Sequence, residues 1–196
     1  MENSLQRLKQ SLFQITKVEN PQWLEFAQQW EQRSFSKQEI LTSFDQVENY
    51  LYFISKGLVR VYYLLEGKEH GLDFCFENEF VTSYSSFLTR RPSRVQITTI
   101  LPTEVLRIHY QQIHKMYDQS KTSERIGRRI AEAMYVRKTQ REIELLSLSA
   151  DQRYQNLLNK NPRLVQAIPI KYLASYLGIL PESLSRIRRK LRNKEA

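Results

Sequence analysis

The fold is decided by residues 168–191, which read IPIKYLASYLGILPESLSRIRRKL. In the first half of this stretch, Leu173, Ala174 and Leu177 recur at helical spacing and predict the buried face of a helix. Gly178 follows directly, at a point where the chain must turn with positive φ and without a Cβ. The first half is therefore predicted to be a short helix that ends in a tight turn.

The second half of the stretch predicts another helix. Pro181 suits a first helical position, and an i, i+3, i+7 apolar stripe follows at Leu184, Ile187 and Leu191. A helix, a short turn with glycine and a second helix make the helix-turn-helix arrangement, whose second helix lies in the major groove of DNA. The alternative is an ordinary helical hairpin with a solvated basic face.

The outward positions of the second helix carry charged and hydroxyl side chains, which are Glu182, Ser183, Ser185, Arg186, Arg188, Arg189 and Lys190. Near the start of such a helix, an arginine can donate two hydrogen bonds to guanine and a glutamate can accept one from cytosine. Lysine and arginine further along suit phosphates. These residue types, in this order, favour a helix that reads DNA over the solvated hairpin.

The excess positive charge lies in the same part of the chain. Residues 1–120 hold 13 Lys and Arg against 14 Asp and Glu, whereas residues 121–196 hold 17 against 7. Charge placed so unevenly indicates that the C-terminal part faces a polyanion, either nucleic acid or an anionic membrane. On charge alone, a solvated arginine-rich helical surface is the competing interpretation.

Before the long C-terminal helical region, the sequence has the pattern that is typical of β-strands. After a helical N-terminal segment with Leu5, Leu8 and Leu12, and a helix opened by Pro21, short runs rich in β-branched and aromatic residues follow. These runs are Phe35, Ile40–Leu41, Tyr50–Ser55, Leu58–Leu65, Leu72–Phe80, Val95–Leu101 and Glu104–Tyr110. Turn residues at 56–57, 66–69 and 101–103 predict hairpins, and regular hairpins predict an antiparallel roll or sandwich.

A long helix is predicted from Thr122 to Ser147, because this segment has no proline and one glycine among good helix formers. Its apolar positions form an imperfect 3–4 seam, made by Ile126, Ile130, Ala133, Val136 and Ile143. Such a seam suits a dimer contact, and a helix packed on its own sheet explains it equally. Ser149 to Gln152 resembles a capping box that opens the next helix.

Composition excludes several classes of protein. No run of about 18 apolar residues exists, and the polar N-terminus lacks a signal peptide, so we expect a cytoplasmic protein without a membrane span. Cys75 alone cannot form an internal disulfide, an iron–sulfur site or a structural zinc site, and the three histidines have no trusted ligand spacing. We therefore expect no metal, no cofactor and no enzyme, since a metal enzyme of the cupin kind would need clustered His and Glu.

The order of parts, a β-roll, a long helix, a short helix and a helix-turn-helix, resembles the Crp–Fnr family of bacterial transcription regulators. The strongest local matches are residues 52–60 (YFISKGLVR), residues 173–179 (LASYLGI) and residues 182–186 (ESLSR). The resemblance implies an α+β fold with an N-terminal antiparallel β-roll of the cyclic-nucleotide-binding kind over residues 1–120. It further implies a dimerisation helix over 121–148 and a DNA-binding domain over 149–196.

By position, the resemblance implies roles in DNA binding for individual residues. Glu182 and Arg186 match base-reading positions, Ser183 and Arg189 match other DNA-contacting positions, and Lys171 matches a phosphate contact. Pro181 stands where many members have a further base-reading arginine, which implies a different operator. Since five residues follow Leu191, the β-hairpin wing of the family is expected to be missing.

The family's phosphate cassette has Phe-Gly-Glu at its start and an arginine before Ser/Thr-Ala at its end. Here residues 80–87 read FVTSYSSF and residues 91–95 read RPSRV, so the ribose-binding glutamate is replaced by Ser83 and the phosphate-binding arginine by Ser93. Cyclic AMP is therefore not expected to bind. The remaining polar set suits another small anion or polar metabolite and consists of Thr82, Ser83, Ser85, Ser86 and Arg94. Hydroxyls that only cap a short helix are the alternative.

The sequence thus predicts a homodimeric, sequence-specific DNA-binding regulator whose partners are double-stranded DNA and an unknown small effector. RNA polymerase is a further expected partner, and no membrane partner is expected. The alternative function is an interaction module related to cyclic-nucleotide-binding domains whose helix-turn-helix does not read DNA.

Overall fold

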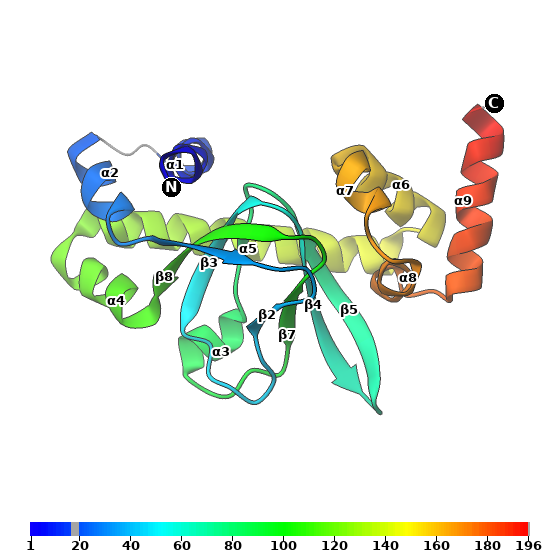
Figure 1. Cartoon of the computed structure of the whole chain (residues 1–196), viewed down its shortest axis with the longest axis horizontal. Helices are drawn as coiled ribbons and strands as arrows, with labels where there is room; N and C mark the ends of the chain where they lie inside the picture. Colours follow the sequence, from blue (N-terminus) through cyan, green and yellow to red (C-terminus); the bar gives the residue numbers. More distant parts are fainter. Residues whose placement is uncertain (17–19, 196) are drawn as a thin grey trace.

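The computed structural model describes residues 1–16 and 20–195 (Figure 1). Two helices, α1 (Glu2–Ile15) and α2 (Asn20–Ala27), precede a roll of eight strands. The long helix α5 (Lys121–Ser147) follows, and four helices complete the described chain: α6 (Ala150–Lys160), α7 (Pro162–Gln166), α8 (Ile170–Leu177) and α9 (Pro181–Glu195). The α+β class expected from the sequence is therefore confirmed.

The roll consists of two four-stranded antiparallel sheets. One sheet has the order β1-β8-β3-β6, formed by Glu31–Phe35, Thr103–His109, Tyr50–Lys56 and Phe80–Val81. The other has the order β2-β7-β4-β5, formed by Ile40–Thr42, Gln96–Thr99, Val59–Leu65 and Lys68–Cys75. Inner side chains of both sheets form the roll's own core, which includes Ile54, Val59, Ile97 and Val105.

The turn between β3 and β4 requires the predicted glycine. Gly57 has φ of +105°, and a Cβ there would lie 2.6 Å from Thr103 Oγ1 and 2.7 Å from the carbonyl oxygen of Pro102. Neither the backbone conformation nor the space admits a larger residue. β3 and β4 belong to different sheets, so this turn, at the motif that gave the resemblance in the roll, links the two sheets and is not the predicted hairpin. The hairpin predicted at 101–103 is wrong for the same reason, because that turn joins β7 of one sheet to β8 of the other.

Two predicted strand boundaries are wrong. The run expected over Leu72–Phe80 is divided, because β5 ends at Cys75 and a turn follows in which Asn78 adopts φ of +67° and its N–H donates to the Ile54 carbonyl. Tyr110 does not end a strand but begins α4 (Tyr110–Gln119), because the side chain of His109 caps this helix by accepting from the N–H of Gln111.

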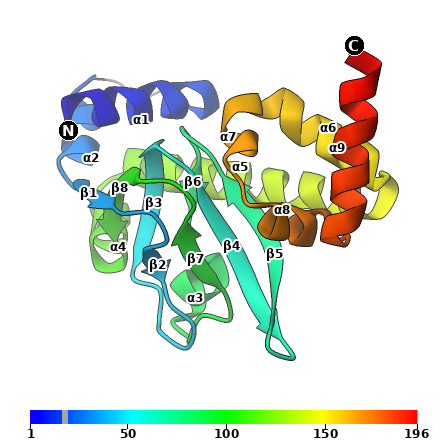
Figure 2. The same cartoon turned by 45° about the vertical axis from the view of Figure 1, so that its right-hand side comes forward.

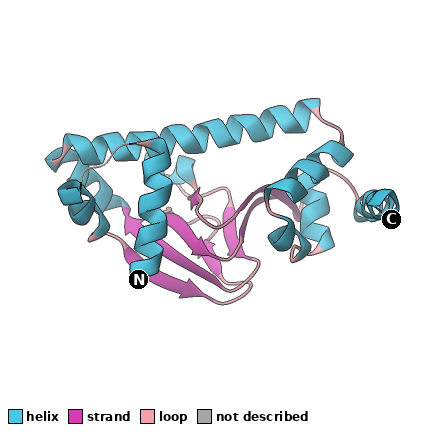
Figure 3. Ribbon diagram, turned by 90° about the horizontal axis from the view of Figure 1, so that it is seen from above, coloured by secondary structure: helices cyan, strands magenta, loops and turns pink. Residues whose placement is uncertain are grey.

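The predicted seam of α5 is really two faces. Ile126 and Ile130 are buried in a core with Leu8 and Leu12 of α1 and Trp23 of α2, so for them the helix packed on its own domain is the correct alternative. Val136 and Ile143 are 52% and 57% exposed, and they align with exposed Leu146 on the opposite side. Figure 3 shows α5 running the length of the molecule beside the sheets, which leaves this outer side uncovered.

The C-terminal helices pack on one end of the roll and on α5 (Figure 2). The capping box at Ser149 and Gln152 is present as predicted and opens α6. A single apolar cluster joins the roll residues Leu58, Phe74, Phe76 and Ile100 to residues of α6, α8 and α9. The C-terminal segment therefore completes its core with residues of the roll.

Candidate functional site

The helix-turn-helix arrangement is formed by α8 and α9. Gly178 ends α8 with φ of +68° and ψ of +33°, and its N–H donates to the Ser175 carbonyl at 3.1 Å. A Cβ on Gly178 would have nothing nearer than 3.8 Å, so the residue is needed for its backbone conformation and not for space. Leu173, Leu177 and Leu184 are fully buried between the two helices and the roll.

The side chains of α9 that are predicted to contact DNA fall into two groups, because some face solvent and others contact α6. Glu182, Arg186 and Arg189 point to solvent, and none of them has an ion pair with a described residue, while Ser183 is half-buried. Arg188 instead donates from Nε to the hydroxyl of Tyr154 at 3.1 Å, and Lys190 pairs with Asp151 at 2.9 Å. The exposed surface of α9 thus carries a carboxylate and two guanidinium groups that are available to a partner.

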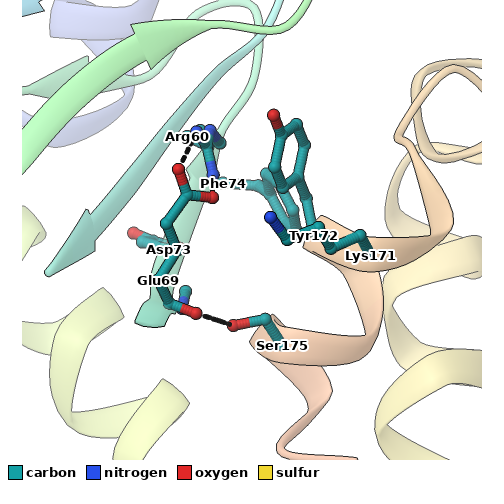
Figure 4. Close-up of a pocket in the computed structure, with 8 residues that line it drawn as sticks. Arg60, Glu69, Asp73, Phe74, Lys171, Tyr172 and Ser175 are labelled. Atoms are coloured by element: carbon teal, nitrogen blue, oxygen red, sulfur yellow. Dashed lines mark hydrogen bonds and ion pairs between the residues drawn. The ribbon is translucent and has the colours of Figure 1, made fainter. Parts of the chain in front are cut away.

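Lys171 lies at the start of α8 beside a cluster between α8 and the β4–β5 hairpin (Figure 4). The buried guanidinium of Arg60 lies between the rings of Tyr62 and Tyr172, 3.9 and 3.6 Å from their centroids. Arg60 also donates to Glu69 at 2.8 and 3.3 Å. These hydrogen bonds, with the charges of Arg60 and Lys171, hold the pKa of the Glu69 carboxyl below its ordinary value.

Ser175 joins α8 to the same hairpin. Its hydroxyl accepts from the N–H of Gly71 at 2.8 Å and donates to the carbonyl of Glu69 at 3.0 Å. Gly71 lies so close to α8 that a Cβ would be 3.0 Å from the backbone nitrogen of Tyr176. The helix-turn-helix is therefore held against the roll by backbone, side-chain and ring contacts.

The cassette of the roll is formed around α3 (Tyr84–Thr89), and its hydroxyls bond within the protein. Ser83 precedes the helix, but its side chain caps no N–H; its oxygen lies 2.7 Å from that of Ser93. Thr82 donates to the Tyr50 carbonyl at 2.8 Å, and Ser86 donates to the Arg91 carbonyl at 2.5 Å. These buried hydroxyls all have partners in the protein.

The remaining residues of the predicted pocket lie apart from this group. Ser85 and Arg94 are exposed, whereas Thr82, Ser83, Ser86 and Ser93 are buried. The structure thus brings three of the five predicted residues together, adds Ser93, and leaves Ser85 and Arg94 at the surface.

A carboxylate that the sequence did not reveal lies inside this cassette. Glu48 is 3% exposed, and its side chain accepts from the hydroxyl of Thr42 and from the N–H of Tyr50 at 2.8 Å. The backbone N–H groups of Ser83 and Asn49 also donate to it. Burial raises the pKa of Glu48, although these hydrogen bonds oppose the shift. The cassette thus encloses a carboxyl group of the protein itself, which takes up the N–H of Ser83.

Within residues 1–16 and 20–195, no group of three His, Cys, Asp or Glu side chains is arranged to hold a metal ion. None of the helices in that part of the chain is long and apolar enough to cross a bilayer.

Comparison with protein families gives one match, a cyclic nucleotide-binding domain over residues 32–120. This region corresponds to the strands of the roll, the cassette and α4. A search of curated proteins found no match to the chain.

Solved structures match almost the whole chain. FixK2 from Bradyrhizobium japonicum is 20% identical with a TM-score of 0.71, over 85% of this chain and 86% of that one. The regulator CLP from Xanthomonas campestris, described as responsive to c-di-GMP, is 19% identical with a TM-score of 0.66, over 88% and 91%. A putative Crp/Fnr regulator from Eubacterium rectale is 16% identical with a TM-score of 0.69, over 90% and 85%. The resemblance is therefore confirmed: residues 32–120 match the model of the cyclic nucleotide-binding domain, and the chain has the fold of Crp–Fnr regulators.

Proposed function

We propose that this protein is a sequence-specific DNA-binding transcription regulator. The observation that carries the proposal is the exposed surface of α9, where Glu182, Arg186 and Arg189 face solvent on the second helix of a helix-turn-helix. In this proposal Arg186 donates to guanine and Glu182 accepts from cytosine. Arg189 and Lys171 contact phosphates, and Ser183 contacts the DNA beside them.

The regulator acts as a homodimer in this proposal. The outer stripe of α5 is defined as Val136, Thr139, Ile143 and Leu146, with spacings of three and four residues. Three of its members are large exposed apolar side chains, and Thr139 is half-buried. This spacing suits a helix that packs along a second copy of itself. Residues 1–120 then serve as the effector-like domain, 121–148 as the dimerisation helix and 149–196 as the DNA-binding domain.

Cyclic AMP is not the effector in this proposal. Glu48 already accepts a hydrogen bond from the backbone N–H of Ser83, so this cassette donor is not free for a cyclic phosphate. A small ligand of the roll other than cyclic AMP would be confined to the rim at Ser85 and Arg94, since Thr82, Ser83 and Ser86 already bond within the protein. RNA polymerase remains a proposed partner of the DNA-bound dimer.

The test is selection of duplexes from a random library, followed by titration of the selected duplex at several salt concentrations. Arg186→Ala should lose discrimination at one base pair, at a cost of about 1–3 kcal/mol. Arg189→Ala and Lys171→Ala should weaken binding to all sequences and reduce the salt slope by about 1. Lys138→Ala removes the same charge from an exposed position of α5 and should change neither quantity.

No enriched sequence, with equal binding of all duplexes, would favour the alternative function of an interaction module that does not read DNA. An Arg186→Ala variant that weakened all duplexes alike would contradict the assigned role of Arg186.

A further inference from the structure

A cleft lies between the roll, α5 and the C-terminal helices, separate from both the cassette and the exposed surface of α9. Its cavity volume is about 80 Å³, well below that of sites for drug-sized ligands, so the part of an occupant that enters it must be small. Four cationic side chains line it: Arg137 and Arg141 from α5, and Arg153 and Lys160 from α6. An occupant would contact all three parts of the molecule.

Two of these cations are already balanced by carboxylates. Arg137 pairs with Asp73 at 3.2 Å and with Glu79 at 3.1 Å, and Lys160 pairs with Glu79 at 3.1 Å. These pairs hold β5 and the following turn to α5 and α6. The carboxylates of Asp73 and Glu79, on the β5 side of the cleft, are therefore both paired with cations.

Arg141 and Arg153 differ, because neither has a carboxylate partner among the described residues. Arg141 lies over the ring of Tyr176, 3.7 Å from its centroid, and donates to the Tyr176 carbonyl. Arg153 donates to the carbonyls of Leu148 at 2.5 Å and Leu177 at 2.7 Å. Both arginines thus donate some of their hydrogen bonds to carbonyls at the C-terminal ends of helices, where a positive charge is stabilised.

The rest of their donor set has no acceptor. Nε and Nη1 of Arg141 and Nε of Arg153 are buried, and no described protein atom accepts from them. Burial and the neighbouring charge of Arg141 lower the pKa of Arg153, as expected for two cations placed close together. Glu144 also lines the cleft, but it forms no ion pair with either arginine in the described residues.

We propose that this cleft binds a phosphorylated small molecule, with Arg141 and Arg153 as its phosphate-binding residues. Three unpaired donor nitrogens on two guanidiniums match a tetrahedral phosphate, which offers several oxygens in different directions, better than a planar carboxylate. The amide of Asn156, which also lines the cleft, supplies a neutral polar group beside them. The site does not depend on whether α9 reads DNA.

The experiment is calorimetric titration of the full chain with inorganic pyrophosphate in 0.15 M salt, without DNA. We expect saturable binding of one pyrophosphate per chain, weakened at least tenfold in Arg141→Met and in Arg153→Met. Arg128→Met is the matched control, because Arg128 is exposed on the same helix and paired with Glu132, and it should bind as the original protein does.

Arg153→Met removes contacts between helices, so circular dichroism melting accompanies each titration. If that variant is unfolded, Arg141→Lys provides the decisive measurement, since it keeps the charge and loses the Nε donor, and it too should bind more weakly. Absence of saturable heat would overturn the proposal, as would unchanged binding in folded Arg141→Met. Loss of binding in an Arg186→Ala, Arg189→Ala double variant would also overturn it by placing the anion on α9. Each of these outcomes leaves the DNA titration to be decided separately.

Discussion

Glu48 is a buried titratable residue that local sequence does not reveal. Its carboxyl group is enclosed by Thr42, Tyr50 and the backbone of the cassette, although the cassette belongs to a later part of the chain. Nothing in the sequence distinguishes Glu48 from a surface glutamate in a loop. Its burial depends on α3, which lies nearly forty residues later, and contacts of this kind are not visible in local patterns.

The buried carboxyl predicts a dependence of stability on pH. Because the folded pKa of Glu48 is raised, the unfolded chain ionises first as pH rises, and the contribution of Glu48 to the free energy of unfolding decreases. That contribution is complete below the ordinary pKa of 4.5 and is lost as pH rises through the folded pKa. Each unit of elevation corresponds to about 1.4 kcal/mol.

The measurement is urea unfolding of the original protein and of Glu48→Gln at several pH values. The stability of the original protein relative to the variant should be greatest at low pH and should decline toward neutrality. Glu66→Gln, at the exposed β4–β5 turn, is the control and should show no such trend. A relative stability that rose with pH would show that hydrogen bonding, and not burial, dominates at Glu48.

At the scale of elements, the sequence predicts those features that depend only on residues close together in the chain, such as turns and helix caps. Gly57 and Gly178 mark turns because only a residue without a Cβ is favoured at their backbone angles. The capping box at Ser149 marked the start of α6 for a similar local reason. The pattern of α5 predicts one seam, whereas in the structure Ile126 is buried and Val136 is exposed, because helical spacing cannot tell which side of a helix the chain itself covers.

The outer stripe of α5 leads to a prediction on assembly. Changing Ile143 and Leu146 together to glutamate should weaken dimerisation, because both are exposed in the single chain and would be buried between two copies. Burial of one such side chain contributes about 1.5–3 kcal/mol, so each loss should raise the dissociation constant about tenfold to a hundredfold. Sedimentation equilibrium measures this constant.

Leu24→Glu is the control for that change, since Leu24 is 59% exposed on α2, away from the stripe. It should leave the dimer intact. A dimer that persisted in the double variant would locate the contact on another surface.

At the scale of the whole molecule, the contact between α8 and the β4–β5 hairpin decides how the helix-turn-helix is oriented. Ser175→Ala should remove two hydrogen bonds to the backbone of Glu69 and Gly71, at a cost of about 1–3 kcal/mol. Hydrogen exchange at the Gly71 amide should become faster, because its acceptor is gone. Exchange at the Gly71 amide measures the contact between α8 and the β4–β5 hairpin directly, in addition to overall stability.

Ser185→Ala is the matched control, since Ser185 bonds only within α9, to the Pro181 carbonyl at 3.1 Å. It should leave exchange at Gly71 unchanged. Equal exchange in both variants would mean that the ring and ion-pair contacts of Arg60, rather than Ser175, hold α8 in place.

The apolar cluster shared by the roll and the C-terminal helices also has a consequence for biosynthesis. Leu58, Phe74 and Phe76 are translated about a hundred residues before Leu173, Leu177 and Leu184, with which they form one core. As the chain leaves the ribosome, the roll therefore exposes an apolar end that α6, α8 and α9, which are synthesised later, cover. Co-translational folding should pause at a nearly complete roll, and the helix-turn-helix should become ordered only after Leu184 has left the ribosome.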